Sequence, residues 1–290
     1  MSGRRVIGVD LGGTKILAGI LDETGVLGEL HERPTPTSSQ EALLDALVET
    51  VADLSEPGIE AVGFGIPARI NQRTGAALGA VNTPIHDVRM RDELEGRLGM
   101  RVGVINDGSA AALAEFVHGA GRRTRDLVLL TLGTGVGGGL VLDGQLYRGW
   151  SEVGHMVIVE DGEPCQGVCT GRGHVESYCS GRAADRLARE VLGPAATAHD
   201  LVEQRHPSLR GIGRHLGAAI ASLINLFDPD VVVVGGGFGV AAFDQLVGPA
   251  REAARREALR GGGEVPIVRA QLGLEAGLVG AALAARDALD

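Results

Sequence analysis

The sequence predicts an α/β protein built from two related domains. The chain has 290 residues, which is enough to bury two cores of ordinary size. In the first half, an apolar strand over residues 4–10 leads through a glycine-rich turn to a second apolar strand over 16–21. The second half repeats this order, with a strand over 126–132, a Gly/Thr-rich turn and a strand over 140–142. The repetition of one design indicates two domains of similar architecture.

The composition excludes several classes of protein. A hydrophobic content of 44% with 22% charged residues is typical of soluble globular chains. The net charge of −10 argues against nucleic-acid binding and against binding to anionic membranes. No run of 18 apolar residues occurs, and residues 1–10 lead directly into a strand without a signal peptide, so we expect a cytoplasmic protein.

The first glycine-rich turn is a candidate phosphate site. A strand follows it, whereas a P-loop is followed by a helix, so the P-loop reading is rejected. Its backbone N–H groups can still bind phosphate, and the carboxylate before it can hold a hydrated Mg²⁺. The only lysine of the chain lies here, which suggests an ammonium near phosphate, although a single residue can also arise by chance. The candidate residues are Asp10, Gly12, Gly13, Thr14 and Lys15.

The second turn has the same character. Gly133, Thr134 and Gly135 lie between two strands, and no helix follows, so dinucleotide binding of the Rossmann type is not expected. One such turn in each half suggests that two domains hold one polyphosphate between them.

A third glycine motif follows a buried strand. Gly235, Gly236 and Gly237 come after the strand at 230–234 and before a helix near 240–257. Glycines at the end of a strand let a flat ligand such as a purine approach the backbone. The alternative is a simple tight connection between strand and helix.

Asn106 and Asp107 end the strand at 102–105 and precede a helix. Open α/β sheets bind ligands at this end of their strands, so Asp107 is a candidate catalytic or binding residue. The alternative role for Asp107 is that of a helix N-cap. The other expected helices cover 38–54, 91–98, 181–191, 198–205, 209–227 and 275–289, with strands at 59–66 and 265–270 and a turn-rich segment at 69–90.

A cluster of cysteines and histidines predicts a metal site. His155, Cys165, Cys169 and His174 supply four nitrogen and sulfur ligands, the number and type that a closed tetrahedral zinc site uses. The alternative is that the cysteines are buried, unliganded thiols, and Cys179 fits no ligand spacing and is expected to pack in the core. Two flanking carboxylates could bind the hydroxyls of a polar substrate, namely those of Glu152 and Glu176.

Taken together, the motifs resemble the ROK family of sugar kinases and regulators over nearly the whole chain. Each glycine motif is weak alone, but six motifs in the family's order are specific. Two departures stand out: the metal motif has a longer first gap and His174 in place of the last cysteine, and the usual Gly-x-Pro-Gly of the sugar pocket reads Gly65-Ile-Pro67-Ala68. The resembling segments are Asp10–Lys15, Asn106–Asp107, Leu132–Gly138, Glu152–His155, His174–Glu176 and Val234–Gly237.

The resemblance implies an actin-like (ribonuclease H-like) ATPase fold with a cleft between two domains. We expect residues 1–118, joined by the C-terminal helix at 275–290, to form one α/β domain. Residues 119–274 should form the other and carry the zinc loop. Relatives are usually dimers, so a homodimer or higher homo-oligomer is expected.

The implied activity is ATP-dependent phosphorylation of a hexose, with glucose converted to glucose 6-phosphate and Asp107 as general base. By the same resemblance, Asn106, Asp107, Glu152, His155 and Glu176 bind the sugar. The three glycine motifs bind ATP, with Mg²⁺ near Asp10.

Several alternatives remain open at this point. Fructose, mannose or N-acetylmannosamine could be the substrate, and polyphosphate could be the donor. The protein could also be a silent sugar-binding protein or a sugar-responsive ROK regulator. Such regulators carry a helix-turn-helix before the first phosphate motif, whereas here only nine residues precede Asp10.

Overall fold

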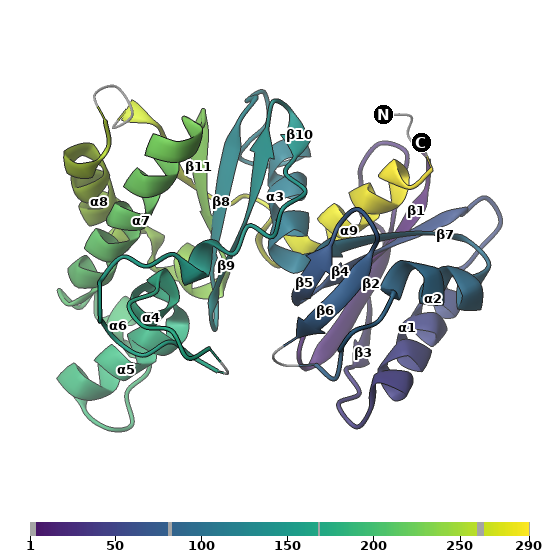
Figure 1. Cartoon of the computed structure of the whole chain (residues 1–290), viewed down its shortest axis with the longest axis horizontal. Coiled ribbons are helices and arrows are strands. Elements are labelled where there is room, and N and C mark those ends of the chain that lie inside the picture. The colour runs from purple at the N-terminus through teal and green to yellow at the C-terminus, as the bar shows by residue number, and fades with distance from the viewer. Residues whose placement is uncertain (1–3, 81–82, 168, 260–263, 290) are drawn as a thin grey trace. The chain divides into compact units, whose positions relative to one another are not determined.

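The computed structural model describes residues 4–80, 83–167, 169–259 and 264–289. The chain forms two compact α/β units (Figure 1). Unit 1 contains Met1–His118, Arg148–Trp150 and Glu275–Asp290, and unit 2 contains Gly119–Tyr147 and Ser151–Leu274.

The sheet of unit 1 has five strands in the order β3-β2-β1-β4-β7. The hairpin of β1 and β2 is antiparallel, and β1, β4 and β7 run parallel. The strands are β1 (Val6–Leu11), β2 (Lys15–Leu21), β3 (His31–Pro34), β4 (Ala61–Ile66) and β7 (Arg101–Asn106).

Unit 2 repeats this topology with the order β10-β9-β8-β11-β12. Again a first antiparallel hairpin, β8 with β9, is extended by two parallel strands, β11 and β12. The two-fold repetition predicted from the sequence is therefore present in the strand order. The strands are β8 (Leu127–Leu132), β9 (Val136–Leu142), β10 (Gln145–Leu146), β11 (Val231–Gly235) and β12 (Ile267–Arg269).

The two faces of the unit 1 sheet differ in side-chain size. Side chains alternate along a strand, so the apolar residues of β1, β4 and β7 share one face, where they pack with α1 (Gln40–Leu54) and α2 (Met90–Leu98). The opposite face carries glycines at matching positions. Gly8 pairs with Gly63, and Gly63 with Gly103, so three parallel strands present one row without side chains.

The C-terminal helix α9 (Ala276–Asp287) lies on this glycine row (Figure 1). A Cβ atom added at any of the three glycines would come within 3.0 Å of an α9 atom, and at Gly63 it would overlap the carbonyl of Ala281. On another side of α9, a Cβ at Gly280 would overlap the backbone of Ala110 in α3 (Asp107–Val117). Only glycine permits this close packing.

Unit 2 has a more conventional apolar core. The long helices α7 and α8 pack against each other, and α8 also packs on β8 and β11. Two glycines of α7, Gly213 and Gly217, lie against the α8 backbone. The helices of this unit are α4 (Val175–Cys179), α5 (Gly181–Leu192), α6 (Ala198–Glu203), α7 (Leu209–Phe227) and α8 (Gly237–Glu257).

Two local expectations were wrong. The turn-rich segment at 69–90 contains a hairpin of β5 (Ala68–Asn71) and β6 (Ala76–Ala80). The third glycine motif is not a loop of three residues: Gly235 ends β11, Gly236 caps α8, and Gly237 is already helical. Within the described ranges, no helix combines the length and hydropathy needed to cross a bilayer.

Adding a side chain at a position of the glycine row should destabilise the protein. Gly63→Ala would force a methyl group into the α9 backbone, so we expect the free energy of unfolding to fall by at least about 2 kcal/mol. Thermal and urea unfolding measure this change.

Gly96→Ala is the matched control. Gly96 is exposed in α2 with nothing within 4 Å of an added Cβ, so alanine should raise stability by about 1 kcal/mol. Equal effects of the two substitutions would contradict the tight fit of α9.

Candidate functional site

The first glycine turn of unit 1 is held by backbone hydrogen bonds. The N–H of Gly12 donates to the carbonyl of Lys15 at 2.9 Å, and the N–H of Thr35 donates to the carbonyl of Thr14 at 3.0 Å. The Thr35 hydroxyl also donates to the carbonyl of Gly12 at 2.8 Å. Thr35, which directly follows β3, therefore fixes the turn. Gly13 and Thr14 of the turn are exposed to solvent.

Asp10 is half-buried beside the start of α9. A Cβ at Gly277 would lie 2.8 Å from the Asp10 carboxyl group, and one at Gly65 would lie 3.3 Å from its Oδ1. Burial, with a smaller contribution from the charge of Asp107, raises the pKa of Asp10 to about 7. A bound divalent cation would stabilise the ionised carboxylate. The raised pKa is therefore compatible with the predicted Mg²⁺ site at Asp10.

Lys15 faces a carboxylate. Its Nζ lies 2.8 Å from Oε2 of Glu32 on β3, and both side chains are about half exposed. The suggestion of an ammonium near phosphate stays a prediction, and this ion pair would have to open for Lys15 to reach a phosphate.

Asn106 and Asp107 divide the roles that the sequence left open. Asn106, and not Asp107, is the N-cap of α3, because its Oδ1 accepts from the N–H groups of Gly108 and Ser109 at 3.0 and 3.2 Å. Asp107 is the first residue of the helix, and its Oδ1 accepts from Nδ2 of Asn106 at 2.9 Å and from the N–H of Gly108 at 2.8 Å.

The surroundings of the Asp107 carboxyl group shift its pKa upward. Crowding by protein atoms raises its pKa, and the hydrogen bonds from Gly108 and Asn106 oppose this rise. Because the side chain is solvent-exposed, water stabilises the charged form as well. Neither of the two hydrogen bonds from Asn106 and Gly108 uses Oδ2, which makes this oxygen the candidate proton acceptor.

The β5–β6 hairpin, which the sequence did not predict, anchors this pair. Nδ2 of Asn106 donates to the carbonyl of Ala68 at 3.1 Å, and Nε2 of Gln72 donates to the Ser109 hydroxyl at 3.2 Å. The methyl group of Ala68, which replaces the glycine of the usual motif, is buried in the core cluster of unit 1. Only the backbone of Ala68 contacts Asn106 in these interactions.

The second glycine turn, in unit 2, is held at both ends. The N–H of Gly133 donates to the carbonyl of Gly135 at 2.9 Å, and the carbonyl of Gly133 accepts from Gly181 at 2.7 Å. The N–H of Val136 donates to Oε2 of Glu176 at 2.8 Å. A Cβ at Gly135 would lie 2.2 Å from Oε2 of Glu176, so a larger residue there would displace that carboxylate.

The third glycine motif lies against the end of β8. Gly236 has a φ of 78°, and a Cβ there would lie 2.5 Å from the carbonyl of Leu132. The motif and the second turn are therefore neighbours, since Leu132 immediately precedes Gly133. This proximity agrees with a role for both in binding one ligand.

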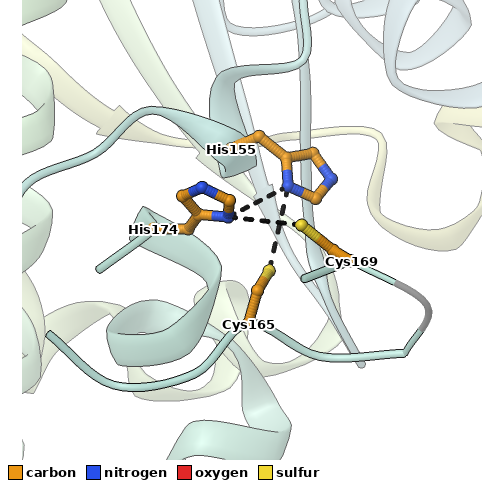
Figure 2. Close-up of side chains that lie close together, drawn as sticks. All are labelled: His155, Cys165, Cys169 and His174. Atoms are coloured by element: carbon orange, nitrogen blue, oxygen red, sulfur yellow. Dashed lines mark hydrogen bonds between the residues drawn. The ribbon is translucent and has the colours of Figure 1, made fainter. Parts of the chain in front are cut away.

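The four expected metal ligands lie together (Figure 2). His155 ends a 3-10 turn (Val153–His155), Cys165 and Cys169 lie in the following loop, and His174 caps α4. Their donor atoms all lie within 4.8 Å of one another. Both histidines face the centre with Nδ1, and the second ring nitrogen of His155 points away from it.

The donor distances fit a tetrahedral zinc ion. With Zn–N of about 2.05 Å and Zn–S of about 2.3 Å, two nitrogens should be about 3.3 Å apart, and nitrogen and sulfur about 3.6 Å apart. The Nδ1 atoms of His155 and His174 are 3.3 Å apart. Cys165 Sγ lies 3.8 Å from Nδ1 of His155, and Cys169 Sγ lies 3.7 Å from Nδ1 of His174. The third cysteine, Cys179, is fully buried, as expected for a packing residue.

The two flanking glutamates differ in their surroundings. Glu152 is exposed immediately before the 3-10 turn. Glu176 is half-buried in α4, with Oε2 on the backbone of the second turn and Oε1 4.0 Å from Cys165 Sγ. Glu176 thus connects the metal cluster to the second turn, a role that sequence spacing alone could not reveal.

The fold and these motifs define an α/β protein of the actin-like class, with one glycine turn in each of two topologically similar units. The chain belongs to the ROK family: a sequence model of the ROK family matches residues 6–288. The family and the fold class predicted from the sequence are therefore confirmed.

Characterised relatives agree with this assignment. The chain is 37% identical to a glucokinase of Streptomyces coelicolor, over 97% of each chain. It is similar to the crystal structure of a ROK family glucokinase from Streptomyces griseus in complex with glucose and AMPPNP, with 36% identity, a TM-score of 0.83 and coverage of 98% and 99%. A ROK hexokinase from Thermus thermophilus gives 34% identity, a TM-score of 0.84 and the same coverage.

The metal cluster predicts one zinc ion per chain. Cys165→Ser should abolish stoichiometric zinc and lower the stability of the protein by about 3 kcal/mol or more, because the loop loses its cross-link. Elemental analysis and thermal unfolding measure both effects. Cys179→Ala, which removes the buried thiol outside the cluster, should retain the zinc, and equal zinc content in all three proteins would contradict the assigned ligands.

The raised pKa of Asp10 predicts that the stability of the protein depends on pH in the absence of Mg²⁺. Its pKa is about 7 in the folded state and about 3.8 in the unfolded state, so the folded state binds more protons between these values. Its contribution to stability is therefore complete below pH 4 and is lost as the pH rises through 7.

Asp10→Asn should remove this dependence and should stabilise the protein at pH 8 by about 2 kcal/mol, a figure reduced for partial solvent contact. At pH 4 the variant and the wild type should have similar stability. Urea unfolding across pH 4–8 is the measurement, and parallel profiles for the two proteins would contradict the raised pKa.

Proposed function

We propose that this ROK-family protein is an ATP-dependent hexose kinase that transfers the γ-phosphoryl group of ATP to the 6-hydroxyl of glucose. The observation that carries the proposal is the orientation of the Asp107 carboxylate. This group is exposed to solvent and is held through Oδ1 by two hydrogen bonds. The names of the similar glucokinases support glucose as the substrate.

Asp107 is the general base. It accepts the proton of the attacking hydroxyl through Oδ2 as the phosphoryl group is transferred. Asn106 keeps the carboxylate in one orientation, and the capped start of α3 keeps Asn106 in place. Catalysis of phosphoryl transfer depends mainly on such alignment and on neutralisation of the phosphate charge.

The glycine motifs bind ATP in this proposal. Gly12, Gly13, Thr14 and Lys15 in unit 1, with Gly133, Thr134 and Gly135 in unit 2, contact the phosphates. The glycines at 235–237 approach the adenosine. Asp10 would hold Mg²⁺, which would neutralise phosphate charge.

Asn106, Asp107, Glu152, His155 and Glu176 bind the sugar. The second ring nitrogen of His155 points away from the cluster and is available for a sugar hydroxyl (Figure 2). A bound zinc ion would hold the His155 ring in this orientation, because Nδ1 is the atom that faces the other candidate ligands.

We also propose that the two compact units correspond to the functional domains, at 1–118 with 275–290 and at 119–274, and that the protein acts in the cytoplasm as a homodimer or higher homo-oligomer. The resemblance to ROK kinases supports the assembly.

Asp107→Asn tests the central role. We expect kcat to fall by about 10²–10⁴-fold, because the amide cannot accept the proton, while glucose still binds. A coupled assay of ADP formation and calorimetry with glucose measure the two quantities. Asp92→Asn, a change at the surface of α2, is the control and should leave both unchanged.

The assay should be run with a panel of hexoses. Glucose with ATP should give the highest kcat/KM, compared with fructose, mannose and N-acetylmannosamine and with polyphosphate as donor. Near-normal turnover by Asp107→Asn would contradict the assignment of the base, and absence of ADP formation with any sugar would contradict the kinase proposal itself.

A further inference from the structure

Gln166 is neither a candidate metal ligand nor a residue of the proposed catalytic and binding sites. It immediately follows the ligand Cys165 and is half-buried. Its Nε2 donates to the hydroxyl of Ser180 at 2.6 Å and to the carbonyl of Glu176 at 3.2 Å. These bonds join the metal loop to the junction of α4 and α5.

The junction in turn holds the second glycine turn. The Ser180 hydroxyl caps α5 by accepting from the N–H of Ala183 at 3.1 Å. The next residue, Gly181, donates its N–H to the carbonyl of Gly133 at 2.7 Å. A Cβ at Gly181 would lie 2.9 Å from the same carbonyl, so a side chain at this position would press against the turn.

Glu176 provides a second connection to the other end of the turn. Its Oε2 accepts from the N–H of Val136 at 2.8 Å, and its Oε1 lies 4.0 Å from Cys165 Sγ. Gln166 also donates to the backbone carbonyl of Glu176, so it constrains the residue that makes this second contact. Both ends of the turn, Gly133 and Val136, are thus linked to the metal loop within unit 2.

We propose that Gln166 is a positioning residue for the nucleotide: it transmits the rigidity of the metal loop to the turn at Gly133–Gly135 and thereby sets the affinity for ATP. The inference rests on the proposed function, in which this turn binds phosphate.

The physical reason lies in the flexibility of the turn. Glycines have many accessible backbone conformations, so a glycine turn binds phosphate well only if other groups have already selected one of them. Without Gln166, Ser180 and Glu176 lose a shared anchor, and nucleotide binding must then order the turn. The metal ligands stay in place, because Gln166 donates to none of their side chains. Of the residues proposed to bind sugar, only Glu176 is bonded to Gln166, and only through its backbone carbonyl.

Gln166→Leu is the test, with Gln166→Met as a second variant of similar length. Binding of AMPPNP with Mg²⁺, and separately of glucose, is measured by calorimetry together with the zinc content. The Kd for AMPPNP should rise about tenfold through loss of the two hydrogen bonds. The Kd for glucose should change much less, since Glu176 is the only proposed sugar-binding residue bonded to Gln166, and the zinc stoichiometry should be unchanged. KM for ATP should rise by a similar factor, and KM for glucose should change much less.

Gln245→Leu is the matched control. Gln245 in α8 also donates its Nε2 to a backbone carbonyl, that of Val202, at 3.0 Å. Its Oε1 is buried and has no hydrogen-bond partner among the described residues, and the same holds for Oε1 of Gln166. Its replacement should leave the AMPPNP affinity unchanged.

The outcomes separate the two proposals. If the wild type does not bind AMPPNP, the proposed function fails and the inference fails with it. If the wild type binds and both Gln166 variants bind equally well, only the inference is overturned. It is also overturned if the affinities for glucose and AMPPNP fall together or if zinc is lost, since Gln166 would then have a general structural role.

Discussion

The backbone contact between α9 and the glycine row is the constraint on which unit 1 depends. Gly8, Gly63 and Gly103 let the helix approach the sheet to a distance that no side chain would permit. The same helix presents Gly280 to α3 and Gly277 to Asp10. One close-packed helix therefore fixes the positions of the helix that begins at Asp107 and of the carboxylate at the first glycine turn.

Unit 2 has the same strand order but achieves rigidity at its turn in another way. Its sheet packs on apolar helices. Its glycine turn is held by contacts with the loop that carries the four candidate metal ligands. Glu176 and Gly181 fix the turn from the side of this loop. The two glycine turns thus have similar sequences and different supports: a neighbouring strand in unit 1 and the metal loop in unit 2.

The sequence predicted those features that local patterns encode. Strands, long helices and the duplicated turns follow from apolar periodicity and glycine position, and the metal cluster follows from ligand type and spacing. The β5–β6 hairpin was missed because its strands have only four and five residues, too few to stand out in a segment rich in turn residues. Asn106 was not recognised as the cap because either of two adjacent residues could serve. The role of Gln166 depends on contacts 10 and 14 residues away, which no local pattern indicates.

The most direct test of the central claim is native-state hydrogen exchange of the amide groups in α9. If α9 holds unit 1 together, the amides of residues 280–285 should exchange with the same free energy of opening as those of β1, β4 and β7, as one cooperative unit. Exchange of α9 through a local opening of much lower free energy, while the three strands remain protected, would contradict the account.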